Sequence, residues 1–205
     1  VKGTKDNQVA LADDNSYEAV QYVKMTNNGT IDLIGGNSVG IYANRGQIKN
    51  NGMIQVLGDK NIGIFSENGT DTENSTNINV GNGGVGIYAV SHQNPSVPPS
   101  IIEAQTIKVK NSGIITAAAG SNAIGIYAKN NKSGGVFGDA QIDLTNGTID
   151  LGASKNAIGV FVDNGEIHEN GTTITVGENG IGIYAKDSDL NLNNLTINLN
   201  GDNSL

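Results

Sequence analysis

The sequence predicts an all-β fold, a parallel β-helix (solenoid) of about seven coils with a basic period of 23 residues and two loop insertions. Three observations predict it. A five-residue motif with an aromatic residue at its fourth position recurs. A three-residue alternating motif keeps step with it, and the residues between the two motifs are rich in Gly and Asn. Strands of this length cannot form independent domains, so each coil must pair with the next one.

The first motif is apolar–Gly–apolar–aromatic–small, and it occurs six times. Its glycines are at positions 40, 63, 86, 125, 159 and 182, so the spacings are 23, 23, 39, 34 and 23 residues. The two longer spacings exceed the basic period by 16 and 11 residues. We therefore expect two insertions, near residues 90–105 and 130–140, that leave the stack at the same corner of consecutive coils.

The second motif alternates apolar and polar residues, which indicates strands with one buried face. Its first apolar positions should form one inward column, namely Ile31, Ile54, Ile78, Ile115, Ile149, Ile174 and Ile197. A second inward column should hold Ile41, Ile64, Ile87, Ile126, Val160 and Ile183. The outward column beside the first one contains no two neighbouring carboxylates, as in-register stacking requires: Asp32, Gln55, Asn79, Thr116, Asp150, Thr175, Asn198.

A weaker third strand contains Ile48, Ile107, Val109, Ile142, Leu144 and Ile167. Aligning these strands puts Lys108, Asp143 and His168 in one outward row, which we interpret as a surface ion pair worth about 0–1 kcal/mol rather than a catalytic triad. A leucine-rich repeat is excluded, because neither its Leu-x-x-Leu-x-Leu signature nor a helical pattern is present.

One solenoid section is expected over residues 1–205, with residues 1–16 irregular and residues 17–24 as a degenerate copy of the aromatic strand. Turn pairs such as Asn28-Gly29 and Asn51-Gly52 often precede the alternating strands, and both residue types tolerate positive φ.

The aromatic residues of the first motif should form a ladder along the stack: Tyr42, Phe65, Tyr88, Tyr127, Phe161 and Tyr184. With Val39 and Ile41 pointing inward, Gly40 and Tyr42 should point outward, so that each ring lies over a glycine. Ladder packing is the favoured interpretation, and a flat platform for sugars is the alternative.

Charge and composition exclude several classes of function. A net charge of −8 argues against nucleic-acid binding. No apolar run reaches the roughly 18 residues that a membrane-spanning helix needs. The chain has no Cys, and His92 and His168 are not spaced as metal ligands, so we expect neither a metal nor another cofactor.

The Gly-Thr-Ile-Asp-Leu stretch at 147–151 and the Gly-Ile-Tyr-Ala-Lys stretch at 182–186, at this spacing, resemble the passenger repeats of large type Va autotransporter adhesins of the kind found in fusobacteria. The resemblance covers roughly residues 17–200. It implies a right-handed parallel β-helix on the bacterial cell surface, anchored by a barrel outside this chain. It also implies adhesion to host cells or other bacteria through a surface protein or glycan.

On this interpretation the chain is a non-enzymatic, monomeric section of a longer adhesin that does not itself contact the membrane. A purely structural spacer and, less favoured, a polysaccharide-degrading β-helix enzyme remain the alternatives. Insertions on one face of a solenoid often bind its ligand. The candidate ligand-binding residues in the insertions are His92, Gln93, Asn94, Pro95, Val97, Pro98, Pro99, Lys132 and Phe137.

Overall fold

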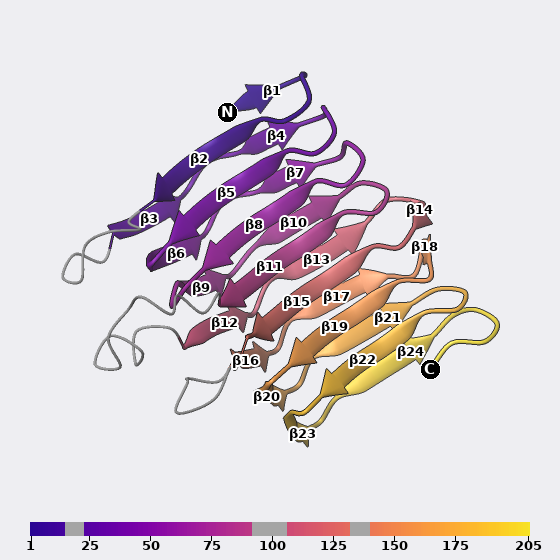
Figure 1. Ribbon diagram of the computed structural model, residues 1–205. Coiled ribbons are helices and arrows are strands. Elements are labelled where there is room, and N and C mark those ends of the chain that lie inside the picture. Colours follow the sequence, from indigo (N-terminus) through magenta and orange to yellow (C-terminus); the bar gives the residue numbers. More distant parts are fainter. Residues whose placement is uncertain (15–22, 92–105, 132–139) are drawn as a thin grey trace.

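The computed structural model describes residues 1–14, 23–91, 106–131 and 140–205, and it confirms an all-β fold. Three long parallel sheets run side by side in a solenoid-like stack, and successive strands in each sheet come from successive circuits of the chain (Figure 1). None of the described residues lies in a helix, so none belongs to a helix that could cross a membrane.

Each circuit contributes one strand to each long sheet, except the last, which contributes only β24 to sheet A. Sheet A consists of β1 (Lys2–Gly3), β4 (Ile31–Leu33), β7 (Ile54–Val56), β10 (Asn77–Val80), β13 (Ile114–Ala117), β17 (Thr148–Leu151), β21 (Thr173–Val176) and β24 (Thr196–Leu199). Sheet B consists of β2 (Val9–Asp14), β5 (Val39–Asn44), β8 (Ile62–Glu67), β11 (Val85–Ser91), β15 (Ile124–Asn130), β19 (Ile158–Asp163) and β22 (Ile181–Lys186).

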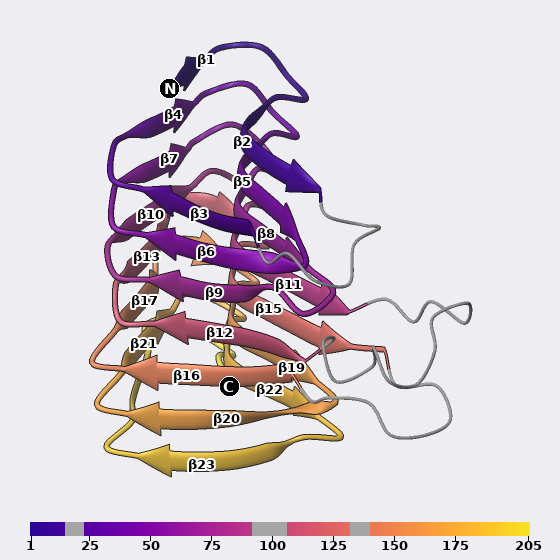
Figure 2. The same ribbon diagram turned by 90° about the vertical axis from the view of Figure 1, so that its left-hand side faces the viewer.

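Sheet C consists of β3 (Val23–Asn27), β6 (Gly46–Asn50), β9 (Asp71–Asn74), β12 (Ile107–Asn111), β16 (Ala140–Thr145), β20 (Gly165–Asn170) and β23 (Asp189–Asn193). Figure 2 shows its strands stacked in chain order. A short pair, β14 (Gly120–Ser121) and β18 (Ser154–Lys155), lies at a corner between sheets A and B.

The core lies inside the stack and contains the two predicted inward columns except at the C-terminal end, where Ile183 is only partly buried and Ile197 is 40% exposed; apolar residues of sheet C, such as Ile48 and Ile107, complete it. Ile31 pairs with Ile54 and Ile41 pairs with Ile64, and all four side chains are at most 1% exposed. The outward column of sheet A also has the predicted order, since Asp32 pairs with Gln55 and each later member with the next. Alternation of apolar and polar residues therefore identified the buried face correctly.

The glycines of the aromatic motif face the core, which contradicts the expected outward orientation. A Cβ at Gly40 would lie 2.5 Å from the carbonyl oxygen of Gly63 and 3.1 Å from Ile54 Cγ2, and Ile54 is fully buried. Val39, expected to be inward, is only half-buried. Glycine is needed here because an isoleucine methyl group and the next backbone occupy the space that a side chain would fill.

The stack begins earlier than expected. Strands β1 and β2 lie in the segment that was expected to be irregular. The degenerate copy of the aromatic strand is β2, because Leu11 pairs with Ile41 and Ala12 with Tyr42. Residues 17–22 lie outside the described residues, and β3, which begins at Val23, belongs to sheet C.

Left-handed residues turn the chain at the corners. Between sheets A and B every circuit has one such residue with φ between 51° and 63°: Asn7, Asn37, Lys60, Gly83, Asn122, Asn156, Asn179 and Asn203. Asn tolerates this conformation better than most residues, which explains its abundance. Asn28 and Asn51 do not have positive φ, although asparagine tolerates it. Gly52 is instead required because a Cβ there would collide with the carbonyl oxygen of Gly29.

Buried asparagines form a ladder where sheet C ends. The Nδ2 atom of Asn27 donates to Asn50 Oδ1, that of Asn50 to Asn74 Oδ1 and that of Asn74 to Asn111 Oδ1, each at 2.8 Å. The next positions in the column are Leu144 and then the buried Glu169, whose carboxylate accepts backbone hydrogen bonds from Thr172 and Asn193. The ladder satisfies polar groups that would otherwise be costly to bury.

Candidate functional site

The outer face of sheet C presents two rows of polar and charged side chains. Register places Lys24, Gln47, Asp71, Lys108, Gln141, Glu166 and Asp189 in the first row. The second row contains Thr26, Lys49, Glu73, Lys110, Asp143, His168 and Asn191. Opposite charges therefore alternate from strand to strand over the middle of this face, which favours in-register pairing.

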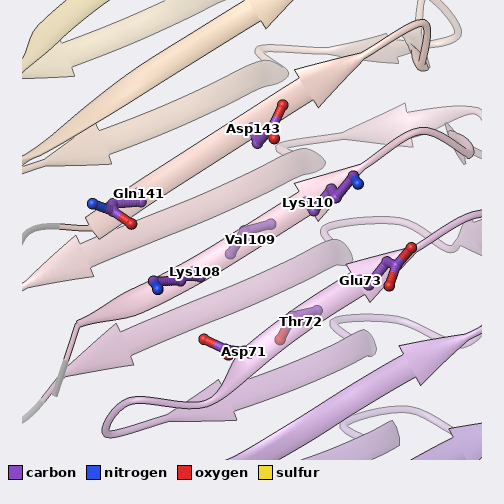
Figure 3. Close-up of a pocket in the computed structure, with 8 residues that line it drawn as sticks. All are labelled: Asp71, Thr72, Glu73, Lys108, Val109, Lys110, Gln141 and Asp143. Atoms are coloured by element: carbon purple, nitrogen blue, oxygen red, sulfur yellow. The ribbon is translucent and has the colours of Figure 1, made fainter. Parts of the chain in front are cut away.

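A shallow depression of about 270 Å³ lies across β9, β12 and β16 on this face. We call it the charged depression and define it by Asp71, Glu73, Lys108, Lys110, Gln141 and Asp143. Figure 3 shows both lysines on the central strand, with the acidic residues on the strands at either side.

Neither central lysine forms a short ion pair with a described residue, although Lys108 lies near Asp71. Within the described parts of the chain, no ion pair shorter than 4.0 Å involves Lys108 or Lys110. Nearby, Lys49 Nζ lies 3.9 Å from Glu73 Oε2, and both side chains are substantially exposed, so this pair contributes at most about 1 kcal/mol. The charged depression thus presents two ammonium groups that no short ion pair holds.

The acidic residues of the charged depression complete a mixed set of polar groups. Partial burial raises the pKa of Asp71, and the nearby Lys108 ammonium opposes that rise. Asp143 Oδ1 accepts a hydrogen bond of 2.8 Å from Thr145 Oγ1. Carboxylates and an amide can bind hydroxyl groups, and ammonium groups can bind an anion, so the site suits a polar ligand such as a saccharide.

The predicted row of Lys108, Asp143 and His168 is wrong in its first member. Asp143 pairs with His168 and with Lys110, whereas Lys108 pairs with Gln141. His168 Nε2 instead lies 3.2 Å from Glu166 Oε2. The expected alignment was shifted by two residues along β12.

Sequence reasoning missed Asp71, Glu73 and Lys110 as neighbours. A usable signal was present, because Thr-Glu-Asn ends at Asn74 and Val-Lys-Asn ends at Asn111. Aligning these two asparagines, which pair in the structure, would have placed Glu73 beside Lys110. Among the described residues no group of three or more His, Cys, Asp or Glu could hold a metal ion.

All nine predicted ligand-binding residues lie in 92–105 and 132–139, outside the described residues. The strand ends that flank these segments are described. Ser91 pairs with Asn130 where the chain leaves sheet B, and Ile107 pairs with Ala140 where it enters sheet C. Both segments therefore leave and rejoin the stack at neighbouring positions of one corner, and the charged depression begins one residue further along.

The aromatic ladder forms on the outer face of sheet B as predicted, but its geometry changes along the stack. The contacts of Phe65 with Tyr42 and Tyr88 are edge-on, with interplanar angles of 60° and 81°. From Tyr88 through Tyr127 and Phe161 to Tyr184 the rings are stacked, with centroids 4.6–5.2 Å apart. Stacked rings cover one another's faces and present their edges outward, which argues against a flat platform for sugars.

A buried carboxylate lies beside the ladder. Asp163 is 3% exposed, and its oxygens lie 3.4 Å from both Lys129 Nζ and Lys186 Nζ, which belong to the strands on either side. Because two lysine ammonium groups neutralise one buried carboxylate, Asp163 links neighbouring strands and does not form an open binding site.

Comparisons with known proteins find no match for this chain among family models, curated proteins or solved structures.

Proposed function

We propose that this chain is a section of a bacterial surface adhesin, a passenger region of the autotransporter type. We further propose a right-handed parallel β-helix of about seven coils with a basic period of 23 residues. In this proposal the section is monomeric, does not contact the membrane, and binds a surface protein or glycan of host cells or of other bacteria. The resemblance of the Gly-Ile-Tyr-Ala-Lys and Gly-Thr-Ile-Asp-Leu repeats supports it.

One observation carries the binding role. Both inserted segments are attached at paired strand ends, and they rejoin sheet C next to Lys108 and Gln141, which line the charged depression. A ligand held by the insertions would therefore lie within reach of the ammonium and carboxylate groups of the charged depression. The asparagine ladder of sheet C and the aromatic ladder of sheet B would keep this region of the stack pre-organised. Pre-organisation reduces the conformational entropy that is lost on binding.

A spacer is the second candidate, and the regular ladders favour it, because a stack of paired strands is stiff whether or not it binds anything. The third candidate is a polysaccharide-degrading enzyme, whose proton transfers need groups such as Asp71 and Lys108, which line one depression. Incubating the chain with acidic and neutral polysaccharides and measuring new reducing ends or unsaturated products tests it. If a product forms and its formation depends on Asp71, the enzyme function is supported and the adhesin proposal is rejected.

The binding role is tested on glycan and protein arrays. We expect the chain to bind at least one surface component, and a variant lacking residues 92–99 and 131–137, closed by short Gly linkers, to lose that binding. Replacing Lys108 and Lys110 together by Gln should weaken it as well. Replacing Lys49 by Gln is the matched control, since Lys49 lies in the same sheet and already has an acidic partner.

Circular dichroism and thermal unfolding first establish that each variant keeps the fold. Equal binding by the parent chain and the deletion variant would assign the insertions no role. No binding to any array component would favour the spacer.

A further inference from the structure

The aromatic ladder contains one direct contact between two tyrosines among the described residues. Tyr88 on β11 and Tyr127 on β15 are register partners, with ring centroids 4.8 Å apart and ring planes 8° from parallel. The other described tyrosines contact phenylalanine in the ladder, Tyr42 next to Phe65 and Tyr184 next to Phe161. The phenol groups of Tyr88 and Tyr127 are thus held side by side. No other pair of described tyrosines is in ring contact.

The ladder fixes this pair and isolates it. Phe65 contacts the Tyr88 ring on one side and Phe161 contacts the Tyr127 ring on the other, at centroid distances of 5.2 and 4.6 Å. Phenylalanine has no hydroxyl group and so forms no phenoxyl radical. Both tyrosines are half-buried rather than fully covered, so a small oxidant or a diffusible radical can reach their edges.

Two adjacent phenols are the substrates of oxidative phenol coupling. Each phenol loses one electron and its hydroxyl proton, which gives a phenoxyl radical with spin density at the ortho ring carbons. The two radicals form a carbon–carbon bond between one Cε atom of each ring. The hydrogen on each bonded carbon then moves to the oxygen, and both rings regain aromaticity. Together the tyrosines lose two hydrogen atoms.

We propose that Tyr88 and Tyr127 form an oxidative cross-linking site, at which a haem peroxidase using hydrogen peroxide joins the two rings as dityrosine. Hydrogen peroxide accepts the two electrons and two protons and becomes two molecules of water. This inference is independent of the adhesive role. Proximity supplies its selectivity, because holding two reacting groups in contact replaces a diffusional encounter by an intramolecular step.

The cross-link would join two strands on which the inserted segments begin. It would close the chain between positions 88 and 127, and this loop includes all residues from 92 to 105. Closing a loop covalently restricts the unfolded chain and so stabilises the fold. An oxidising environment would therefore strengthen the stack at the corner where the insertions leave it.

The test treats the full chain, dilute enough to suppress links between molecules, with a haem peroxidase and hydrogen peroxide. We expect dityrosine fluorescence in a product that remains monomeric and is lighter by two hydrogen atoms. Peptide mapping should find Tyr88 and Tyr127 joined, and the oxidised chain should unfold at a higher temperature than the untreated one.

Tyr88→Phe and Tyr127→Phe should each abolish the intramolecular product. Phenylalanine already occupies two positions of the ladder, so both variants should keep the fold, as circular dichroism can check. Tyr42→Phe and Tyr184→Phe are the matched controls and should cross-link like the parent chain. The proposal is overturned if the parent forms no dityrosine, if it forms only links between molecules, or if Tyr88→Phe and Tyr127→Phe leave the yield unchanged.

Discussion

Replacing Asn74 by Ala should destabilise the stack strongly, because this side chain links the buried asparagine ladder. Its Oδ1 accepts from Asn50 Nδ2, and its Nδ2 donates to Asn111 Oδ1, both at 2.8 Å. Its Nδ2 also donates to the Thr76 carbonyl at 2.9 Å, but that oxygen keeps a second donor, the backbone N–H of Ile114. The substitution thus leaves two buried polar groups unsatisfied.

The magnitude follows from these two groups. Each buried donor or acceptor that loses its partner costs about 1–3 kcal/mol, so we expect a loss of roughly 2–6 kcal/mol in the free energy of unfolding. Asn50, Asn74 and Asn111 are all 0% exposed, so water cannot replace the lost partners without opening the stack. Denaturant unfolding followed by circular dichroism measures the loss.

Asn51→Ala is the matched control, one residue away from the ladder. Its Nδ2 donates to Asn28 Oδ1 and its Oδ1 accepts from Ser75 Oγ, but all three side chains are exposed. Water replaces such partners, so the control should change the free energy of unfolding by no more than about 0.5 kcal/mol. Equal losses in the two variants would refute the assigned role of the ladder.

Three further predictions concern the core, the glycines and the tyrosines. Ile126→Asp should melt the stack, since Ile126 is fully buried, whereas Asp150→Asn on the outer face should cost about 0.5 kcal/mol or less; equal thermal midpoints would contradict this assignment. Gly86→Ala should destabilise the fold by about 1–3 kcal/mol, because its Cβ would lie 2.5 Å from Ile115 Cγ2; chemical denaturation showing no loss would be inconsistent with that packing. Burial and a hydrogen bond to a carboxylate raise the pKa of Tyr42 above its ordinary value of 10.0. Its contribution to stability is therefore complete below pH 10.0 and lost as the pH rises further. Burial raises the pKa of Tyr88 and Tyr127 as well, so an absorbance titration of a Tyr42→Phe variant should show one late-ionising tyrosine fewer than the parent chain.

Much of the fold follows from local patterns in the sequence. The pairing order of the two inward columns and of the outward column of sheet A was predicted correctly, because alternation identifies the buried face and the repeat spacing identifies the partner strand. The exceptions in burial are Ile183 and Ile197 in the last coil, which are not fully buried. The common corner of the two insertions was predicted in the same way, from additions that follow the same motif. These features depend only on the order of residues within one coil.

The candidate site depended on register, which the sequence pattern leaves open in sheet C. A shift of two residues leaves every side chain on its original face, so alternation could not distinguish Lys108 from Lys110 as the neighbour of Asp143. Only the structure shows Asn74 beside Asn111, and this pairing places Glu73 against Lys110. The spacing of apolar residues alone therefore does not specify the register of sheet C. In the structure, the buried hydrogen bonds between asparagines of neighbouring coils occur together with this register.

The sequence by itself determined the stacking of parallel strands, the residues that fill the core and the side of the stack that carries the insertions. The tertiary structure decided the inward orientation of the glycines, the beginning of the stack at β1 and β2, the asparagine ladder and the composition of the charged depression. The physical reason is that alternation reports only whether a side chain is buried or exposed. Contacts between coils depend on register and on the space left by the neighbouring backbone, which become fixed only when the coils pack together.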